Sequence, residues 1–226
     1  TAVGYKALED LTGGDGNIAV GCYAGSSILT GLSNVAIGAY DGTTTGAMRL
    51  STAAGQCIAI GTGALAAVVT AAADGTVSIG YKSLNALTSG AQNIAIGYQA
   101  MAAQDTGLRN IAIGYQAMDA AANAEKDNIA IGVDALGNMN NADSDYNIAI
   151  GNYAGDGIGT VGGTENIFLG YTAGGGTWAT ADSTHNVAIG NYSMNGAMNG
   201  ALNNTAVGHQ SLSSATRASG SVAMGY

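Results

Sequence analysis

Proline is absent from the 226 residues of this chain, and charged side chains make up only 9% of it. A soluble globular domain usually carries about 25% charged residues, so an ordinary globular surface is not expected. The lack of proline also argues against a collagen helix and against a proline-rich linker. Glycine, in contrast, occurs 37 times, which is about twice the usual share.

Basic side chains are scarce as well, with six Lys and Arg against 15 Asp and Glu and a net charge of −9. Because no basic run occurs, the electrostatic footprint of a nucleic-acid-binding protein is missing. No stretch approaches the ~20 consecutive apolar residues of a membrane span. We therefore expect no nucleic-acid partner and no membrane insertion in this segment.

What the sequence does contain is one short motif, Asn-[Ile/Val]-Ala-[Ile/Val]-Gly, repeated about thirteen times. An array that fills residues 1–226 leaves no room for a second domain and predicts a repeat architecture. Both chain ends fall inside a motif, so we expect a piece of a longer fibre polypeptide. Successive motif glycines are 17 to 23 residues apart, and we expect each to form the corner of one repeat unit, or coil. These corner glycines are Gly4, Gly21, Gly38, Gly61, Gly80, Gly97, Gly114, Gly132, Gly151, Gly170, Gly190, Gly208 and Gly225.

The residues before each corner glycine alternate with the period of two that is typical of a β-strand, as in Asn93-Ile94-Ala95-Ile96-Gly97. One unit of 17–20 residues cannot bury its own apolar face, whereas stacked units can, with parallel strands about 4.8 Å apart. The predicted fold class is therefore all-β, a parallel β-solenoid or β-roll of about 13 coils. We expect Ile and Val to point into the coil, and the alanines to form an outer stripe that packs against a neighbouring copy.

Two further positions recur in each unit. Asparagines stacked along the axis can bond to one another and to their own turn, so we predict a structural ladder that is interrupted at Cys57, Thr76 and Ser221. The ladder position lies four places before the glycine, at Asn17, Asn34, Asn93, Asn110, Asn128, Asn147, Asn166, Asn186 and Asn204. An apolar residue seven or eight places after the glycine is expected to fill the core, at Leu11, Ile28, Val68, Leu87, Met139, Ile158, Trp178 and Met198.

The motif Asn-Ile-Ala-Ile-Gly followed by Tyr-Gln-Ala-Met, as in residues 93–101 and 110–118, resembles the head repeat of trimeric autotransporter adhesins, the YadA-like head. It is also similar to repeats in bacteriophage tail-fibre proteins. The resemblance covers the entire chain. It implies a left-handed parallel β-roll that is assembled as a homotrimeric fibre and displayed outside the cell, on a cell surface or a virion.

These observations predict a structural and adhesive extracellular fibre segment that mediates attachment as a rigid multivalent rod. Its partners would be copies of itself and a glycan or protein receptor on a host surface. The alternative is a self-assembling extracellular structural filament. A β-helix polysaccharide-degrading enzyme would need clustered carboxylates or basic residues on one face, and the six basic residues are scattered. We therefore expect no enzyme, no catalytic residue and no cofactor.

Few side chains suggest a specific site. Acidic residues cluster at residues 143–145 and 10–15, but the glycine-rich repeat of calcium-binding β-rolls is absent, so we expect no metal site. His185 and His209 occupy different repeat positions and are not expected to share a site. Cys22 and Cys57 lie two coils apart, about 9–10 Å, which exceeds the ~7 Å that a disulfide spans, so free thiols are predicted.

Trp178 is the one candidate for contact with a glycan, since it follows a glycine-rich loop near Tyr171 and could stack on a sugar ring. It also lies eight residues after Gly170, at the apolar position that is expected to fill the core. We favour the interpretation that its ring fills the core.

Overall fold

The fold is an all-β parallel β-solenoid with almost no helix, as the repeat predicts. The computed structural model describes residues 1–42, 45–120, 124–178, 180–214 and 216–226. Within these residues the chain forms thirteen strands of two or three residues each and one 3-10 helix. Each strand coincides with the alternating residues of one motif, so the short period-two pattern alone locates it.

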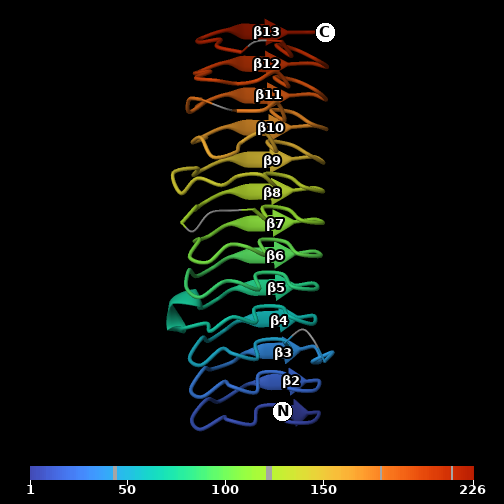
Figure 1. The fold of residues 1–226 in the computed structure, drawn as a ribbon, viewed down its shortest axis with the longest axis vertical. Coiled ribbons are helices and arrows are strands. Elements are labelled where there is room, and N and C mark those ends of the chain that lie inside the picture. Colours follow the sequence, from blue (N-terminus) through green and yellow to red (C-terminus); the bar gives the residue numbers. More distant parts are fainter. Residues whose placement is uncertain (43–44, 121–123, 179, 215) are drawn as a thin grey trace. The chain divides into compact units, whose positions relative to one another are not determined.

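Residue contacts divide the chain into two compact units, Thr1–Asn110 and Ile111–Tyr226. The first holds β1 (Ala2–Val3), β2 (Ile18–Val20), β3 (Val35–Ile37), β4 (Ile58–Ile60), η1 (Ala71–Ala73), β5 (Val77–Ile79) and β6 (Ile94–Ile96). The second holds β7 (Ile111–Ile113), β8 (Ile129–Ile131), β9 (Ile148–Ile150), β10 (Ile167–Leu169), β11 (Val187–Ile189), β12 (Thr205–Val207) and β13 (Val222–Met224). In each unit every strand pairs in parallel with the next one along the chain (Figure 1).

The register between strands follows the motif without a slip. In β8 and β9, for example, Ala130 pairs with Ala149, and the flanking isoleucines pair in the same way. The backbone N–H of Gly151 donates to the carbonyl of Ile131 at 2.8 Å, which continues the pairing into the corner. The strands stay in register although the individual coils differ in length, so the loops between the strands contain the extra residues.

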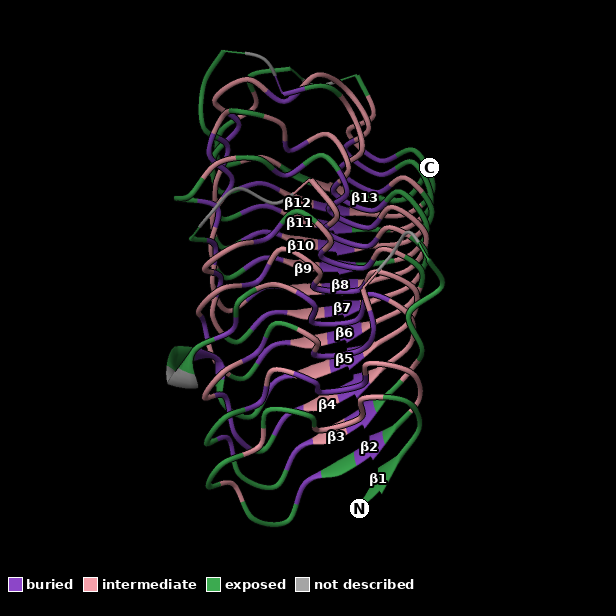
Figure 2. Cartoon of the chain, turned by 60° about the horizontal axis from the view of Figure 1, so that its bottom comes forward, coloured by how far each residue is buried: buried purple, intermediate pink, exposed green. Residues whose placement is uncertain are grey.

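The assignment of the two strand faces from the sequence is wrong. Ala is the buried residue of the strand: Ala95 is 0% exposed, whereas Ile150 and Ile189 are 41% and 38% exposed (Figure 2). The inside of the coil is filled by the Leu or Met that lies four residues after the corner glycine, such as Met101 and Leu136, which are fully buried. These long side chains leave room for only a methyl group from the strand, so Ile and Val point outward.

The loop after the corner supplies the remaining core. Leu11 is half-buried, and Ile28, Leu87, Met139, Ile158, Trp178 and Met198 are buried, as predicted. The prediction for Val68 is wrong, because its side chain is 54% exposed and Val69, at 0% exposed, takes the core position. One extra residue in that loop moves the inward position by one.

The asparagines that precede the strands stack as a hydrogen-bonded column inside each unit. From Asn128 to Asn204, every Oδ1 accepts the backbone N–H of the next asparagine at 2.8–3.1 Å and its Nδ2 at 2.9–3.1 Å. In the first unit, Asn34 donates in the same way to Asn17. Where Cys57 interrupts the motif, its backbone N–H still donates to Asn34 Oδ1 at 3.0 Å. The column therefore satisfies polar groups that the coil interior would otherwise leave unpaired.

Gln104 is a polar residue at the apolar loop position that Leu87 occupies in the preceding coil, and substituting it is expected to stabilise the chain. Its side chain is 0% exposed, and neither amide atom has a hydrogen-bond partner among the described residues. We expect Gln104→Leu to raise the free energy of unfolding by about 1–2 kcal/mol, because a buried unpaired amide is replaced by an apolar side chain. Thermal unfolding followed by circular dichroism measures this, with Gln104→Asn as the control that keeps the amide. An unchanged or lower melting temperature for Gln104→Leu would contradict the prediction.

Candidate functional surfaces

The first surface is the outward face of the parallel sheet. The first and third residues of the strands form two rows of Ile and Val, with occasional Leu, Thr and Met, and no residue of the described strands is charged. Ile18, Val20 and Ile37 in the first unit are 41%, 38% and 37% exposed. Single exposed apolar residues are common, but a continuous apolar strip is rare on a monomeric protein and marks a place of contact.

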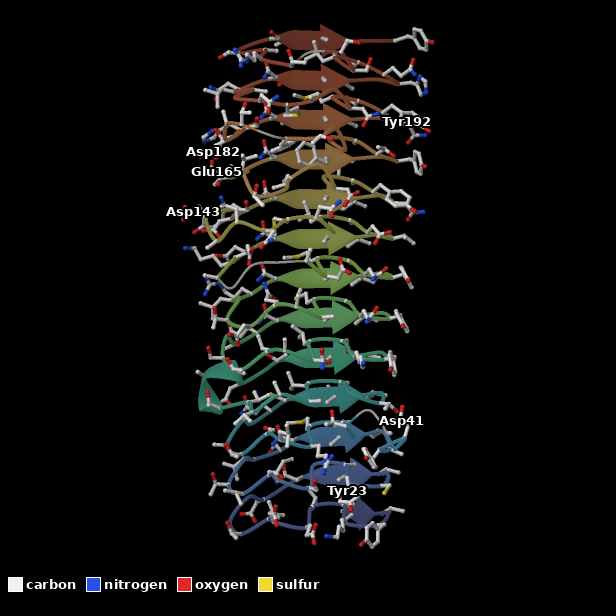
Figure 3. The ribbon with its side chains drawn as sticks, viewed as in Figure 1. Tyr23, Asp41, Asp143, Glu165, Asp182 and Tyr192 are labelled. Carbon is white, nitrogen blue, oxygen red and sulfur yellow. The ribbon has the colours of Figure 1, made fainter. Side chains whose placement is uncertain are left out.

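The second surface is a row of aromatic rings at the corner of the coil, where Tyr23 and Tyr192 are labelled (Figure 3). In the first unit the ring centroids of Tyr5 and Tyr23 are 5.6 Å apart, and those of Tyr81 and Tyr98 are 5.3 Å apart. The second unit has a row of its own, formed by Tyr153, Tyr171, Tyr192, His209 and Tyr226 with spacings of 5.3–6.0 Å. The spacing follows from the rise between stacked coils.

The orientation of these rings depends on the backbone position that carries them. When both rings directly follow the corner glycine they stack, as in Tyr81 and Tyr98 at 18° and His209 and Tyr226 at 14°. When one ring lies a residue later, the pair meets edge to face, as Tyr153 and Tyr171 do at 86°. In these pairs, the angle between neighbouring rings thus follows the sequence position of each aromatic residue.

Among the described residues, basic side chains lie over the aromatic row of the first unit. Arg49 lies 4.8 Å from the ring centroid of Tyr23 and 5.2 Å from that of Tyr40. Lys6 lies 5.7 Å from the Tyr23 ring. These cations occupy ring faces there, since a cation is attracted to the centre of an aromatic ring.

A hollow of about 500 Å³ lies in the second unit, over the loops that follow the corners, and its walls include Asn138, Asp156, Thr160 and Trp178. Trp178 is only 3% exposed and packs edge to face on Phe168, with ring centroids 5.9 Å apart. Its ring has no open face on which a sugar could stack. Trp178 therefore fills the core, and the glycan contact that its surroundings suggested has no geometric support at this residue.

Three aspartates of successive coils in the second unit have raised pKa values, and one of them, Asp156, lines this hollow. Burial raises the pKa of Asp119, Asp134 and Asp156, and the charge of Asp134 raises the pKa of the other two further. Asn138 Nδ2 donates to Asp156 Oδ1 at 2.8 Å, which favours the ionised form of that carboxylate. Among the described residues, no group of three or more His, Cys, Asp or Glu side chains could hold a metal ion.

The other residues that the sequence singled out are separate from one another. Asp145 forms an ion pair with Lys126 at 3.1 Å, so the acidic cluster at residues 143–145 is partly neutralised. His185 Nε2 lies 3.1 Å from Glu165, whereas His209 belongs to the aromatic row. The structure brings none of these groups together into a reactive constellation.

The two cysteines are free thiols, as predicted. Cys57 is buried, and its Sγ lies 3.3 and 3.4 Å from the carbonyl oxygens of Gly55 and Ala73, either of which can accept its single S–H. Burial raises the pKa of the Cys57 thiol, so the nucleophilic thiolate is disfavoured. Cys22 is half-buried next to a corner.

The aromatic row is the surface that reasoning from the sequence did not identify. Its signal was present, because a tyrosine follows most corner glycines by one or two places. No protein-family model matches the chain, and no curated protein or solved structure shows significant similarity to it. None of the described helical residues forms a helix that is long and apolar enough to cross a membrane.

Proposed function

We propose that this chain is a structural and adhesive segment of an extracellular fibre, in which copies associate side by side through the outward rows of Ile and Val. The observation that carries the proposal is the uncharged apolar face, which recurs at two positions of the strands in both units. Water covers this face in an isolated chain. Burying it against a partner contributes about 25 cal/mol per Å² of apolar surface.

A second copy of the chain suits this face for two physical reasons. Its rows repeat with the same rise of about 4.8 Å, so β-branched side chains of two copies can interlock over many coils. The net charge of −9 repels copies elsewhere, which makes the uncharged face the favourable place of contact. We propose the homotrimer that the repeat resemblance implies. Such a rod would serve attachment to a host-surface receptor, from a cell surface or a virion.

The assembly is tested by the molar mass in native buffer. Size-exclusion chromatography with light scattering should give three times the 22.1 kDa mass of the chain. The double variant Ile150→Lys and Ile189→Lys places two charges in the apolar row and should lower the mass to that of one chain. Circular dichroism should show the same β content.

The matched control is Thr180→Lys with Thr216→Lys, which adds the same charge at exposed loop positions and should leave the mass unchanged. A monomeric unmodified chain would overturn the proposal. Filaments of indefinite length in negative-stain images would instead favour the alternative, a self-assembling structural filament, over a finite rod.

A further inference from the structure

The second unit contains the same pair of residues at two corners that are two coils apart. Asn152-Tyr153 follows Gly151, and Asn191-Tyr192 follows Gly190. Both tyrosines have φ of 59°, so both lie in the left-handed region of backbone conformation. Tyr171 lies between them and meets both rings edge to face, with centroids 6.0 and 5.3 Å away.

The two asparagines are held as fixed hydrogen-bond donors. Asn152 Oδ1 accepts the backbone N–H of Val133 at 3.0 Å, and Asn191 Oδ1 accepts that of Tyr171 at 2.9 Å. Each bond occupies the amide oxygen, and the described residues provide no acceptor for either Nδ2. Both side chains are exposed. The surface therefore presents two oriented N–H₂ groups about 10 Å apart, which is the rise of two coils.

The rings beside these donors are open to solvent. Tyr153, Tyr171 and Tyr192 are 38%, 41% and 36% exposed. Aromatic rings of this kind combine a broad apolar face with a polar hydroxyl. The two basic residues of this unit, Lys126 and Arg217, do not follow a corner glycine. In the coil that precedes Tyr153, the equivalent position is occupied by Asp134. The surface is thus aromatic and rich in amides, and it disfavours an anionic ligand.

We propose that the row formed by Asn152, Tyr153, Tyr171, Asn191 and Tyr192 binds an extended, neutral β-linked N-acetylhexosamine glycan of the chitin type. In such a chain each sugar is turned over relative to the one before it, so the acetamido carbonyl returns to the same side at every second sugar. This disaccharide repeat is similar in length to the rise of two coils. The two asparagine Nδ2 groups donate to successive carbonyls on that side, while sugar rings pack on the tyrosines.

This inference names a receptor class for the proposed fibre and rests on that function for its biological setting only. The experiment is calorimetric titration of the full chain with chitohexaose, and with cellohexaose, which lacks the acetamido group. Chitohexaose should bind more tightly than cellohexaose. The variant Tyr153→Ala with Tyr192→Ala should weaken chitohexaose binding about tenfold or more, since it removes two packing surfaces.

A second variant separates the donors from the rings. Asn152→Asp with Asn191→Asp keeps the oxygen that accepts the backbone N–H and removes the N–H₂ donor. It should weaken chitohexaose binding about tenfold and leave any cellohexaose binding unchanged. The matched control is Tyr81→Ala with Tyr98→Ala, a stacked pair of the first unit that lacks the asparagines, and it should bind as the unmodified chain does.

The outcomes distinguish this inference from the proposed assembly. A trimeric chain that does not bind chitohexaose, or that binds it as weakly as cellohexaose, would overturn the glycan site alone. A monomeric chain that binds chitohexaose with the expected loss in both variants would support the site and overturn the fibre proposal. If the Tyr153→Ala, Tyr192→Ala variant dissociates the trimer, the row is an interface between copies and the glycan site is refuted.

Discussion

Replacing the corner glycine Gly132 by alanine is expected to destabilise the chain by about 4 kcal/mol or more. Gly132 has φ of +138°, a conformation that L residues rarely adopt. A Cβ built on it would lie 2.5 Å from the carbonyl oxygen of Gly151 and 2.6 Å from its carbonyl carbon. Because both contacts involve backbone of the next coil, no side chain can turn away, and β8 and β9 would have to separate.

The measurement is urea unfolding followed by circular dichroism, with Gly159→Ala as the control. Gly159 lies in the same unit, and the nearest atom to an added Cβ is a backbone oxygen of Trp178 at 3.8 Å, an ordinary contact. That substitution should change the free energy of unfolding by less than about 1 kcal/mol. A Gly132→Ala chain that unfolds at the same urea concentration as the unmodified one would refute the requirement for glycine at the corner.

The repeat spacing was sufficient to predict the parallel sheet and its register. Each motif holds Ala between two branched residues and ends in glycine, so aligning the glycines aligns Ala130 with Ala149. Such periodicity is informative because every coil makes the same contacts with its neighbours. The loops are less predictable, as Val68 and Val69 show, since an insertion of one residue exchanges which side chain points inward.

The inward face of the strand could not be chosen from the strand alone. Ile is more hydrophobic than Ala, which favours Ile in the core when only three residues are considered. The choice is made by the residue four places after the corner, because Met118 and Leu136 already occupy the coil interior. Volume, rather than hydrophobicity, decides which strand residue fits.

Phe168 demonstrates this volume constraint. It occupies the position of the inward Ala in β10, and it is fully buried. A Cβ on Gly174 would lie 2.4 Å from its Cδ1, and one on Gly155 would lie 2.9 Å from its Cδ2. Both glycines stand four places after a corner, where Leu or Met is usual. Here glycine replaces the large residue four places after the corner, and Phe replaces the Ala of the strand. Both exchanges are visible in the sequence, and together they indicate that the Ala position of the strand faces inward.

The row of Asn152, Tyr153, Asn191 and Tyr192 depends on facts that the sequence does not contain. The recurrence of Asn-Tyr after a corner glycine is readable, but the hydrogen bond that turns each amide outward is not. The alternation of ring orientation also requires the backbone angles of the corner. The glycine-rich loop near Tyr171 suggests a sugar contact at Trp178, whereas the burial of this side chain follows from the packing of its loop.

The substitution Asn147→Ala is expected to destabilise the second unit by about 3–6 kcal/mol, because it leaves several buried polar groups without partners. Asn147 Oδ1 accepts both the backbone N–H and the Nδ2 of Asn166 at 3.1 Å. Its own Nδ2 donates to Asn128 Oδ1 and to the carbonyl of Gly163. The side chain is 0% exposed, so water cannot replace these bonds without opening the coil.

Because the total stability of a domain is of the order of 5–15 kcal/mol, such a loss should lower the urea midpoint strongly. Asn140→Ala is the control, since that asparagine is exposed and makes no side-chain hydrogen bond within the described residues. It should stay within about 0.5 kcal/mol of the unmodified chain. Hydrogen exchange adds a local test, because the amide of Asn166 donates to Asn147 Oδ1 and should lose its protection first. Equal midpoints for the two variants would show that the asparagine column contributes little, and the outward rows and the core side chains would then have to hold the coils together.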